Sequence, residues 1–269
     1  MRRDWVLLKL GGELLEGAQL ELMAKAVAEA SKGTRLGVVH GGGREIDAAL
    51  ARAGIEKRQV EGIRVTDEAT LEIVVGVLAG AVNTRFVAAI NAAGGTAVGL
   101  TGADAGLVVV APAAPHVSVD GSVTDLGRVG HPSGVAGAAV LTTLADGGYI
   151  PVIASIGAAP DGTLYNVNAD TFAAHLAGAI AGRLVIAGAT AGVLDETGRT
   201  IPALDQAART RLIASGVASA GMVAKLRACE DALSGGAREV VLVDGRDPEA
   251  VRAAIAGTVE RAPSTRMVA

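Results

Sequence analysis

Short apolar runs alternate with longer helix-like patterns along almost the whole chain, and this alternation constrains the fold more than any other feature. The apolar runs have the length of β-strands, and the segments between them have the length and periodicity of helices. Strands that are separated by helices need crossover connections and therefore run parallel. The sequence predicts an α/β protein with a mostly parallel sheet.

Most of the expected elements follow from this pattern. We expect strands at Trp5–Leu10, Arg35–His40, Thr96–Leu100, Leu107–Ala111, Ile150–Ile156, Arg183–Ala187 and Glu239–Asp244. We expect helices at Leu20–Ala30, Glu45–Ala53, Asp67–Ala93, Val135–Asp146, Thr171–Ile180, Asp205–Ser215, Val223–Leu233 and Pro248–Ala256. Asp120-Gly121 is a hairpin signal between residues 117–119 and 122–124, and Asp195–Arg199 indicates a second turn between short strands.

The composition excludes several classes of protein. With one Trp, two Tyr and two Phe, the core must be built from Ala, Val, Leu and Gly, which suits parallel strands under closely packed helices. The net charge of −4 and the absence of a basic run with interleaved aromatic residues argue against a nucleic-acid surface. The single cysteine, Cys229, fits a reducing compartment.

No secretory signal is visible, and the longest apolar stretch, Ile73–Val82, is too short to span a bilayer. We therefore expect a cytoplasmic protein without membrane or nucleic-acid partners. No linker rich in Pro or Ser divides the chain and no repeat is present, so we expect a single domain over residues 1–269.

Two glycine-rich segments follow strands, where ligands of open α/β sheets bind. In Lys9–Gly12 the two glycines let the backbone approach a ligand closely, and Lys9 is one of only five lysines. In His40–Gly43 three glycines precede a helix, and their amides would attract an anion. A lysine at a strand end and a flexible turn are the alternative interpretations. Neither segment is a Walker A loop or a dinucleotide fingerprint.

Three more polar segments each precede a helix. In Gly62–Asp67, Thr66 or Asp67 would cap the helix, whereas Arg64 suits two-point binding of a carboxylate. In Asn166–Asp170, the two asparagines face the same way if the segment is extended, and Asp170 would be near a helix N-cap. Gly221–Leu226 places Lys225 on a helix behind a glycine, although by itself Lys225 would be an ordinary surface residue.

Phosphoryl transfer makes chemical sense of this set. Its transition state spreads negative charge over the phosphoryl oxygens, so that catalysis is mostly positioning and electrostatic stabilisation. Two lysines on opposite sides would hold that charge, and an aspartate between them would orient both. An acceptor that is already a carboxylate needs no general base, so none of the four histidines is required.

The five segments, in this order and over nearly the whole chain, closely resemble the amino acid kinase family. Within the family they are most similar to members that phosphorylate the γ-carboxylate of N-acetyl-L-glutamate with ATP in arginine biosynthesis. The resemblance implies a three-layer αβα sandwich with a mainly parallel sheet of about eight strands. It also implies an N lobe of about residues 1–157 for the acyl amino acid and a C lobe of about residues 158–269 for MgATP.

The resemblance also implies roles for individual residues. Lys9 and Lys225 would be catalytic and stabilise the transferring phosphoryl group, and Asp170 would organise them. The implied substrate-binding residues are Gly42, Gly43, Arg64 and Asn166, and the implied nucleotide-binding residues are Gly11, Gly12, Gly221 and Lys225. Mg²⁺ would be held mainly by the phosphates of ATP, so no protein metal site is expected.

The chain departs from the family pattern in three places. Gly188–Gly192 lacks the aspartate that is usual near the nucleotide, and Thr101–Gly106 lacks a lysine that is often found there. Lys9 lies so near the start that the N-terminal helix of arginine-inhibited hexameric members has no room. We therefore expect a homodimer that is insensitive to arginine; sedimentation as a hexamer would contradict this.

Two alternative functions share the fold. One is a kinase for a carrier-linked glutamate or α-aminoadipate in lysine biosynthesis, which would want a basic rim of the kind that Lys57, Arg58 and Arg64 supply in small measure. The other is a non-catalytic amino acid sensor, which would be expected to lose one of the lysines or the aspartate that this chain keeps.

Overall fold

The computed structural model describes residues 4–118, 120–180, 182–214, 220–258 and 263–268. Its centre is an eight-stranded sheet in the order β14-β16-β15-β13-β1-β2-β10-β5. The pairings are parallel except that β16 runs antiparallel to β15. The expected mainly parallel sheet of about eight strands is confirmed. The strands of this sheet are β1 (Trp5–Leu10), β2 (Arg35–His40), β5 (Ala97–Thr101), β10 (Ile150–Ala154), β13 (Arg183–Gly188), β14 (Ala203–Leu204), β15 (Glu239–Asp244) and β16 (Ser264–Met267).

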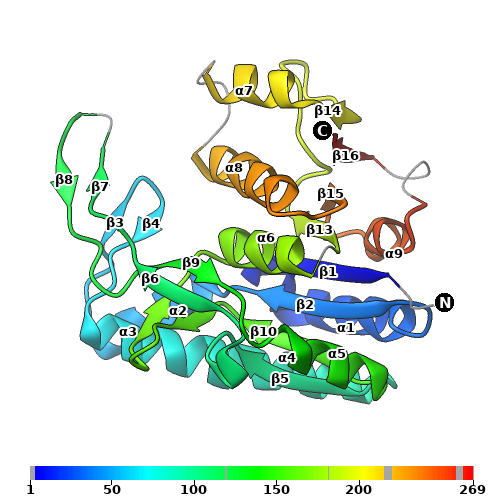
Figure 1. The fold of residues 1–269 in the computed structure, drawn as a ribbon, viewed down its shortest axis with the longest axis horizontal. Coiled ribbons are helices and arrows are strands. Elements are labelled where there is room, and N and C mark those ends of the chain that lie inside the picture. Colours follow the sequence, from blue (N-terminus) through cyan, green and yellow to red (C-terminus); the bar gives the residue numbers. More distant parts are fainter. Residues whose placement is uncertain (1–3, 119, 181, 215–219, 259–262, 269) are drawn as a thin grey trace.

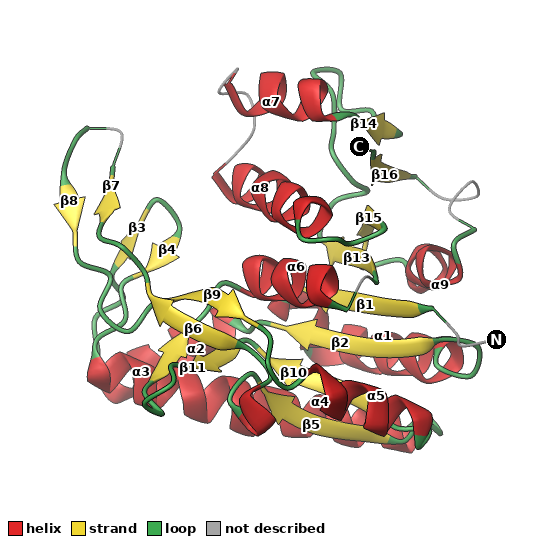
Figure 2. Ribbon diagram, in the orientation of Figure 1, coloured by secondary structure: helices red, strands yellow, loops and turns green. Residues whose placement is uncertain are grey.

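Helices cover both faces of this sheet, which gives the expected three layers (Figures 1 and 2). One face carries α5 (Ala138–Asp146), α6 (Ala169–Ala179) and α8 (Ala220–Ser234), and the other carries α1 (Gly17–Ala30), α4 (Asn83–Ala92) and α9 (Pro248–Ala256). Strand β1 shows how the sequence directs this packing, because alternate side chains enter different cores. Trp5 and Leu7 pack toward α6 and α8, whereas Val6, Leu8 and Leu10 pack toward α1, α4 and α9.

Smaller sheets extend from the carboxyl ends of the central strands. A four-stranded sheet contains β12 (Leu164–Asn166), β11 (Ile156–Ala158), β6 (Val109–Pro112) and β9 (Gly130–Gly134). Two hairpins, β3 (Gln59–Val60) with β4 (Ile63–Arg64) and β7 (His116–Val117) with β8 (Val123–Thr124), project beyond it (Figure 1). The remaining helices are α2 (Gly43–Ala53), α3 (Glu68–Val75), α7 (Gln206–Ala214) and the short turns η1 (Gly12–Leu15) and η3 (Asp104–Gly106).

The expected element positions are largely confirmed, with several corrections. Strands β9, β12, β14 and β16 were not among the expected strands. The expected helix Asp67–Ala93 is divided into α3, a π-helical segment η2 (Gly76–Val82) and α4. The expected strand Ile150–Ile156 breaks at Ser155, where the chain leaves the central sheet for the four-stranded one. The hairpin β3–β4 was not expected, because its strands have only two residues each. The hairpin at Asp120-Gly121 is confirmed for β7 and β8, while Val119 and Ser215 lie outside the described residues.

The segment Glu68–Ala92 is long and apolar enough to cross a membrane by length and composition alone, with 33% of its most apolar window buried in the fold. Core helices of globular proteins can have the same length and composition. Here Val82, Phe86 and Ile90 lie fully buried against the sheet and α1. The buried face of this segment therefore accounts for part of its hydropathy.

Candidate active site

Lys9, Asp170 and Lys225 meet at the carboxyl end of β1. The Nζ of Lys9 lies 2.8 Å from Oδ1 of Asp170, and the Nζ of Lys225 donates a hydrogen bond to Oδ2 at 3.2 Å. Lys9 follows Trp5 and Leu7 on the face of β1 that is covered by α6 and α8. Asp170 lies in the first turn of α6 and Lys225 in the second turn of α8. The structure therefore brings together the three residues that the sequence suggested as catalytic.

Asn168, not Asp170, caps α6. The Oδ1 of Asn168 accepts hydrogen bonds from the backbone N–H groups of Asp170 and Thr171. The sequence placed Asp170 near the N-cap, where capping would have occupied its carboxylate. With the cap supplied by Asn168, both oxygens of Asp170 face ammonium groups. At the other predicted cap, Asp67 accepts from the backbone N–H of Thr70, as expected.

Asp170 is ionised although it is 6% exposed. Its burial opposes ionisation, but the positive charges of Lys9 and Lys225 outweigh that effect and hold the pKa of the carboxyl below its usual value. A single negative charge thus stands between two positive ones. The cluster carries a net positive charge at a sheet edge, which suits a polyanionic ligand.

The two predicted glycine loops touch at this edge. A Cβ on Gly12 would lie 2.7 Å from the Cα of Gly42, and a Cβ on Gly42 would lie 2.9 Å from a side-chain methyl of Leu78. Neither position has room for a side chain. Gly11 is less restricted, since its Cβ would meet only the flexible carboxylate of Glu13. The contact forms a cradle of bare backbone, which suits close approach of phosphate groups.

Helix α2 begins at Gly43 with an open N-terminus. Its N-cap residue, Gly42, has no side chain to satisfy the first amides. Among the described residues, no group accepts a hydrogen bond from the N–H of Gly42 or of Gly43. Free amides and the helix dipole together favour an anion at this point.

A cavity of about 230 Å³ lies beside the cluster and unites the predicted substrate-binding residues. Gly42, Gly43, Arg64 and Asn166 all line it. Asn168 and Ala169, which directly precede Asp170 in the chain, form part of the wall, so the cavity reaches the backbone beside the cluster. The other residues of the wall are Gly41, Ile46, Gln59, Gly62, Ile63, Leu78, Val129, Ser155, Val167 and Asn168.

Arg64 is prepared for an anionic ligand. Its side chain is 8% exposed, and its Nη2 pairs with Oδ1 of Asp47. Asp47 also accepts from Nζ of Lys57 at 2.7 Å. The other terminal nitrogen of Arg64, Nη1, is buried without a hydrogen-bond partner among the described residues. A buried guanidinium nitrogen that lacks an acceptor is costly, and a carboxylate in the cavity would supply one.

Sequence reasoning missed Gln59 and Ser155 in this cavity. Gln59 belongs to the unexpected hairpin β3–β4, whose turn places Glu61 and Gly62 at positive φ. Gly62 was the one available signal for that turn. Ser155 interrupts an apolar run, and a polar residue between two buried strands marks the point where the chain changes sheet.

The segment Gly188–Gly192, which lacks the aspartate that is usual in the family, begins next to the side chain of Lys225. A Cβ on Gly188 would be 3.7 Å from Cε of Lys225. Beyond Gly188 the chain turns, and the hydroxyl of Thr190 donates to the carbonyl of Gly192 at 3.0 Å. Gly221 is exposed in the first turn of α8, four residues before Lys225.

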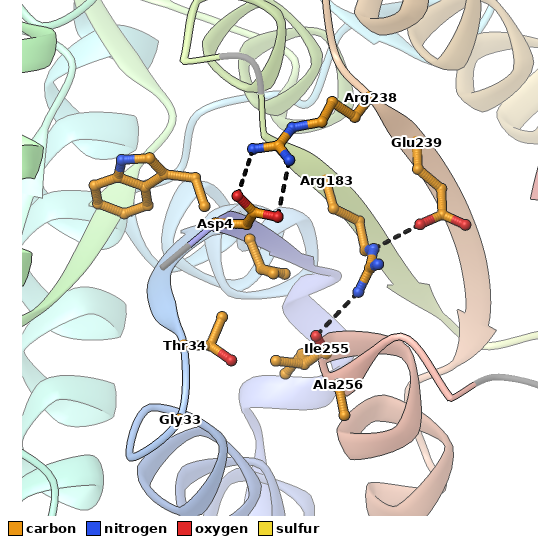
Figure 3. Close-up of a pocket in the computed structure, with 10 residues that line it drawn as sticks. Asp4, Gly33, Thr34, Arg183, Arg238, Glu239, Ile255 and Ala256 are labelled. Atoms are coloured by element: carbon orange, nitrogen blue, oxygen red, sulfur yellow. Dashed lines mark hydrogen bonds and ion pairs between the residues drawn. The ribbon is translucent and has the colours of Figure 1, made fainter. Parts of the chain in front are cut away.

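A second cavity, of about 290 Å³, lies at the opposite ends of the strands and contains none of the predicted site residues (Figure 3). Its charged groups pair with each other: Asp4 with Arg238, and Arg183 with Glu239. Arg183 also donates to the carbonyl of Ile255 at 3.2 Å. Amino ends of parallel strands are not the usual ligand side, and these charges already have partners. Among the described residues, no three His, Cys, Asp or Glu side chains gather as metal ligands.

The lysine–aspartate cluster makes stability depend on pH. Asp170→Asn leaves two ammonium groups without their counter-charge, and breaking such a buried pair costs about 3–5 kcal/mol of unfolding free energy. Because the folded-state pKa of Asp170 lies below its unfolded value, its ionisation stabilises the fold above that unfolded value. The stabilisation is lost as pH falls through the folded-state pKa. Urea unfolding of both proteins should give a difference at pH 7 that shrinks in acid; a difference that persists in acid would contradict this assignment.

Comparison with known proteins identifies the family of this chain. The model of the amino acid kinase family matches residues 4–244. The acetylglutamate kinase of Methanopyrus kandleri is 41% identical over 241 residues, which cover 88% of this chain and 94% of that protein. The acetylglutamate kinase of Brucella canis is 42% identical over 253 residues, with 91% of this chain and 85% of the relative covered.

Solved structures share the fold at lower sequence identity. The N-acetylglutamate synthase of Neisseria gonorrhoeae, complexed with coenzyme A and N-acetyl-glutamate, superposes with a TM-score of 0.84 at 24% identity. The match covers all of this chain but only 60% of the synthase. A carbamate kinase from Giardia gives a TM-score of 0.70 at 14% identity, with 100% of this chain and 99% of the other covered. On the family match and the two relatives above 40% identity, this chain is a kinase of the amino acid kinase family.

Proposed function

We propose that this kinase transfers the γ-phosphate of ATP to the γ-carboxylate of N-acetyl-L-glutamate, as a step of arginine biosynthesis. One observation carries the proposal: the wall of the cavity lined by Arg64, Asn166 and the open N-terminus of α2 includes Ala169, the residue next to Asp170 of the Lys9–Asp170–Lys225 cluster. A site for a small dicarboxylate thus lies next to a site for polyphosphate. The acetylglutamate kinases at 41% and 42% identity support the choice of substrate.

In the proposed complex, Arg64 and Asn166 bind the α-carboxylate side of the substrate. The unpartnered Nη1 of Arg64 then gains an acceptor. The amides of Gly42 and Gly43 hold the γ-carboxylate that attacks. Because this acceptor is already ionised, no side chain has to remove a proton from it.

The transferring group would lie between the two lysines. A carboxylate oxygen forms a bond to the γ-phosphorus, the bond from that phosphorus to the β–γ bridging oxygen breaks, and ADP leaves. Lys9 and Lys225 stabilise the charge on the phosphoryl oxygens, and Asp170 holds both ammonium groups in place. Gly11, Gly12 and Gly221 let the backbone approach the nucleotide phosphates.

The nucleotide would bring its metal with it. We propose that Mg²⁺ is coordinated mainly by the ATP phosphates, the usual arrangement for an ion that keeps its own hydration shell. It would neutralise part of the phosphate charge. We also propose that residues 1–157 supply most of the acyl amino acid site and residues 158–269 most of the MgATP site, since Arg64 and Gly42 belong to the first part and Lys225 to the second. Asn166, Gly11 and Gly12 cross this division.

Neither alternative function is favoured. The two relatives reported above are acetylglutamate kinases, and none of the observations points to a carrier-linked substrate. A sensor would not need Lys9, Asp170 and Lys225 in mutual contact. We further propose a cytoplasmic location, which agrees with the single, buried and unpaired cysteine, Cys229.

The substrate is tested by trapping the acyl phosphate with hydroxylamine in the presence of MgATP. We expect hydroxamate from N-acetyl-L-glutamate and much less from free L-glutamate or N-acetyl-α-aminoadipate. Lys9→Ala and Lys225→Ala should each lower kcat by at least about 10²–10³-fold, the range for losing one group that stabilises a transition state. Lys25→Ala, on the exposed face of α1, is the matched control. No hydroxamate from any of the three substrates would reject the proposed function.

The role of Arg64 is tested separately by Arg64→Lys. A lysine keeps the charge but loses the planar two-point geometry, so KM for N-acetyl-L-glutamate should rise by about tenfold or more while KM for ATP stays unchanged. Arg44→Lys, whose side chain is 76% exposed, should leave both constants unchanged. An equal effect of Arg64→Lys on both KM values would show that Arg64 supports the whole site and not the acyl amino acid.

We propose that the protein is a homodimer and is not inhibited by arginine. Strand β5 is an edge of the central sheet, and the apolar segment Glu68–Ala92 beside it keeps much of its surface outside the core. A second copy of the chain would cover both. Sedimentation should give twice the 26.7 kDa of one chain, and L-arginine should leave the rate unchanged. A monomer, a hexamer or inhibition by arginine would contradict the proposal.

A further inference from the structure

A polar pair lies inside the core, outside the residues assigned above. His40 is fully buried at the end of β2, and Asn83, which is 4% exposed, faces it from the start of α4. The Nδ2 of Asn83 lies 3.0 Å from Nε2 of His40 and donates to the carbonyl of Val152 at 2.9 Å. The Nδ1 of His40 lies 3.1 Å from the carbonyl oxygen of Gly41.

The surrounding structure makes room for this pair. A Cβ on Gly99, in β5, would lie 2.1 Å from Oδ1 of Asn83, so only glycine leaves space for the amide. Asn83 directly follows the π-helical segment Gly76–Val82, and such segments often occur near functional sites. Polar groups are expensive to bury between a helix and a sheet unless their hydrogen bonds are made. Asn83 therefore occupies a position that would suit an apolar side chain, and its hydrogen bonds to His40 and Val152 compensate for the burial of its amide.

The carbonyl oxygens of Val152 and Gly41 determine which nitrogen of the His40 ring carries the proton. The carbonyl of Val152 can only accept, so the Asn83 nitrogen faces it, and the same nitrogen can only donate to Nε2 of His40. The carbonyl of Gly41 also can only accept, so the imidazole proton is on Nδ1. Burial lowers the pKa of His40 to about 4, so the ring is neutral at physiological pH.

The hydrogen bond from His40 orients the glycine loop. The carbonyl of Gly41 and the N–H of Gly42 belong to one planar trans peptide and therefore point in opposite directions. With the carbonyl held toward the buried ring, the Gly42 amide is directed away from His40. Gly42 lines the cavity, and no described group accepts from its amide.

We propose that His40, with its tautomer set by Asn83, is a positioning residue that fixes the Gly42 amide toward the attacking carboxylate. The inference rests on the proposed function for its effect on the rate, but not for its geometry. Without the restraint, the Gly41–Gly42 peptide could rotate, because glycine has few conformational barriers. The amide would then have to be reordered in each transition state.

Three substitutions separate this role from packing. His40→Asn places an amide nitrogen near the position of Nδ1, so it keeps a donor for Gly41 and loses the partner of Asn83. His40→Gln reaches the position of Nε2, so it keeps a partner for Asn83 and loses the donor for Gly41. His40→Leu fills the space and loses both. If His40 is purely structural, kcat of His40→Gln should be at least as high as kcat of His40→Asn. If His40 positions the loop, kcat of His40→Asn should be the higher one.

We expect His40→Gln and His40→Leu to lower kcat by about 10²-fold with little change in KM for ATP, and His40→Asn to restore most of the loss. Val38→Ala is the control, since Val38 is fully buried on the same face of the same strand as His40, and its apolar side chain makes no hydrogen bond to the glycine loop. It should lower the unfolding free energy and leave kcat unchanged. A kcat that simply follows stability across all four variants would overturn the proposal.

The ¹⁵N shifts of the His40 ring in the wild-type protein test the geometry without any substrate. We expect a protonated Nδ1 and an unprotonated Nε2 at neutral pH. A ring protonated on Nε2 would overturn the proposal even if the enzyme is active. If the ring is protonated on Nδ1 as expected but the protein does not phosphorylate N-acetyl-L-glutamate, the proposed function is rejected and the inferred geometry of the loop stands.

Discussion

The candidate active site depends on the ion pairs that the buried carboxylate of Asp170 makes with Lys9 and Lys225. It joins the end of β1, the start of α6 and the second turn of α8, three elements that are far apart in the sequence. Without this carboxylate the two ammonium groups on either side of it would repel each other, and the buried Lys9 would carry a charge without a partner. The same charge that stabilises the fold would therefore set, in the proposed function, where a phosphoryl group is held. This explains why α6 is capped by Asn168, which leaves the aspartate to the lysines.

The fold could be read from the sequence wherever hydrophobic periodicity was strong. Strands β1, β2 and β15 and helix α9 have the expected bounds, since each carries a long uniform pattern. The β3–β4 hairpin could not be predicted, because two-residue strands have no periodicity and their stability comes from tertiary contacts. The π-helical segment was missed for a related reason: its small apolar residues are compatible with an ordinary helix, and the wider turn becomes visible only in three dimensions.

The candidate site was predictable only as separate pieces. The glycine loops, both lysines and Arg64 could be selected from residue type and position, and the structure brings them to one edge of the sheet. The partners of these residues could not be found that way. Asp47, which holds Arg64, is one of several charged residues in an amphipathic helix, and Asn83 resembles any polar residue that follows an apolar run. Nothing local distinguishes a side chain that orients a site residue from one that faces water.

The order of strands at one edge of the sheet has a consequence for biosynthesis. Among the described strands, β14 joins the sheet only through β16, although about sixty residues separate the two in the chain. During synthesis on the ribosome, residues 203–204 must therefore wait without a pairing partner until residues 264–267 have emerged. The segments around Lys9 and Lys225 are synthesised earlier and can fold earlier, whereas the pairing of β14 with β16 forms last. A nascent chain would thus be able to form the Lys9–Asp170–Lys225 cluster before its sheet is complete.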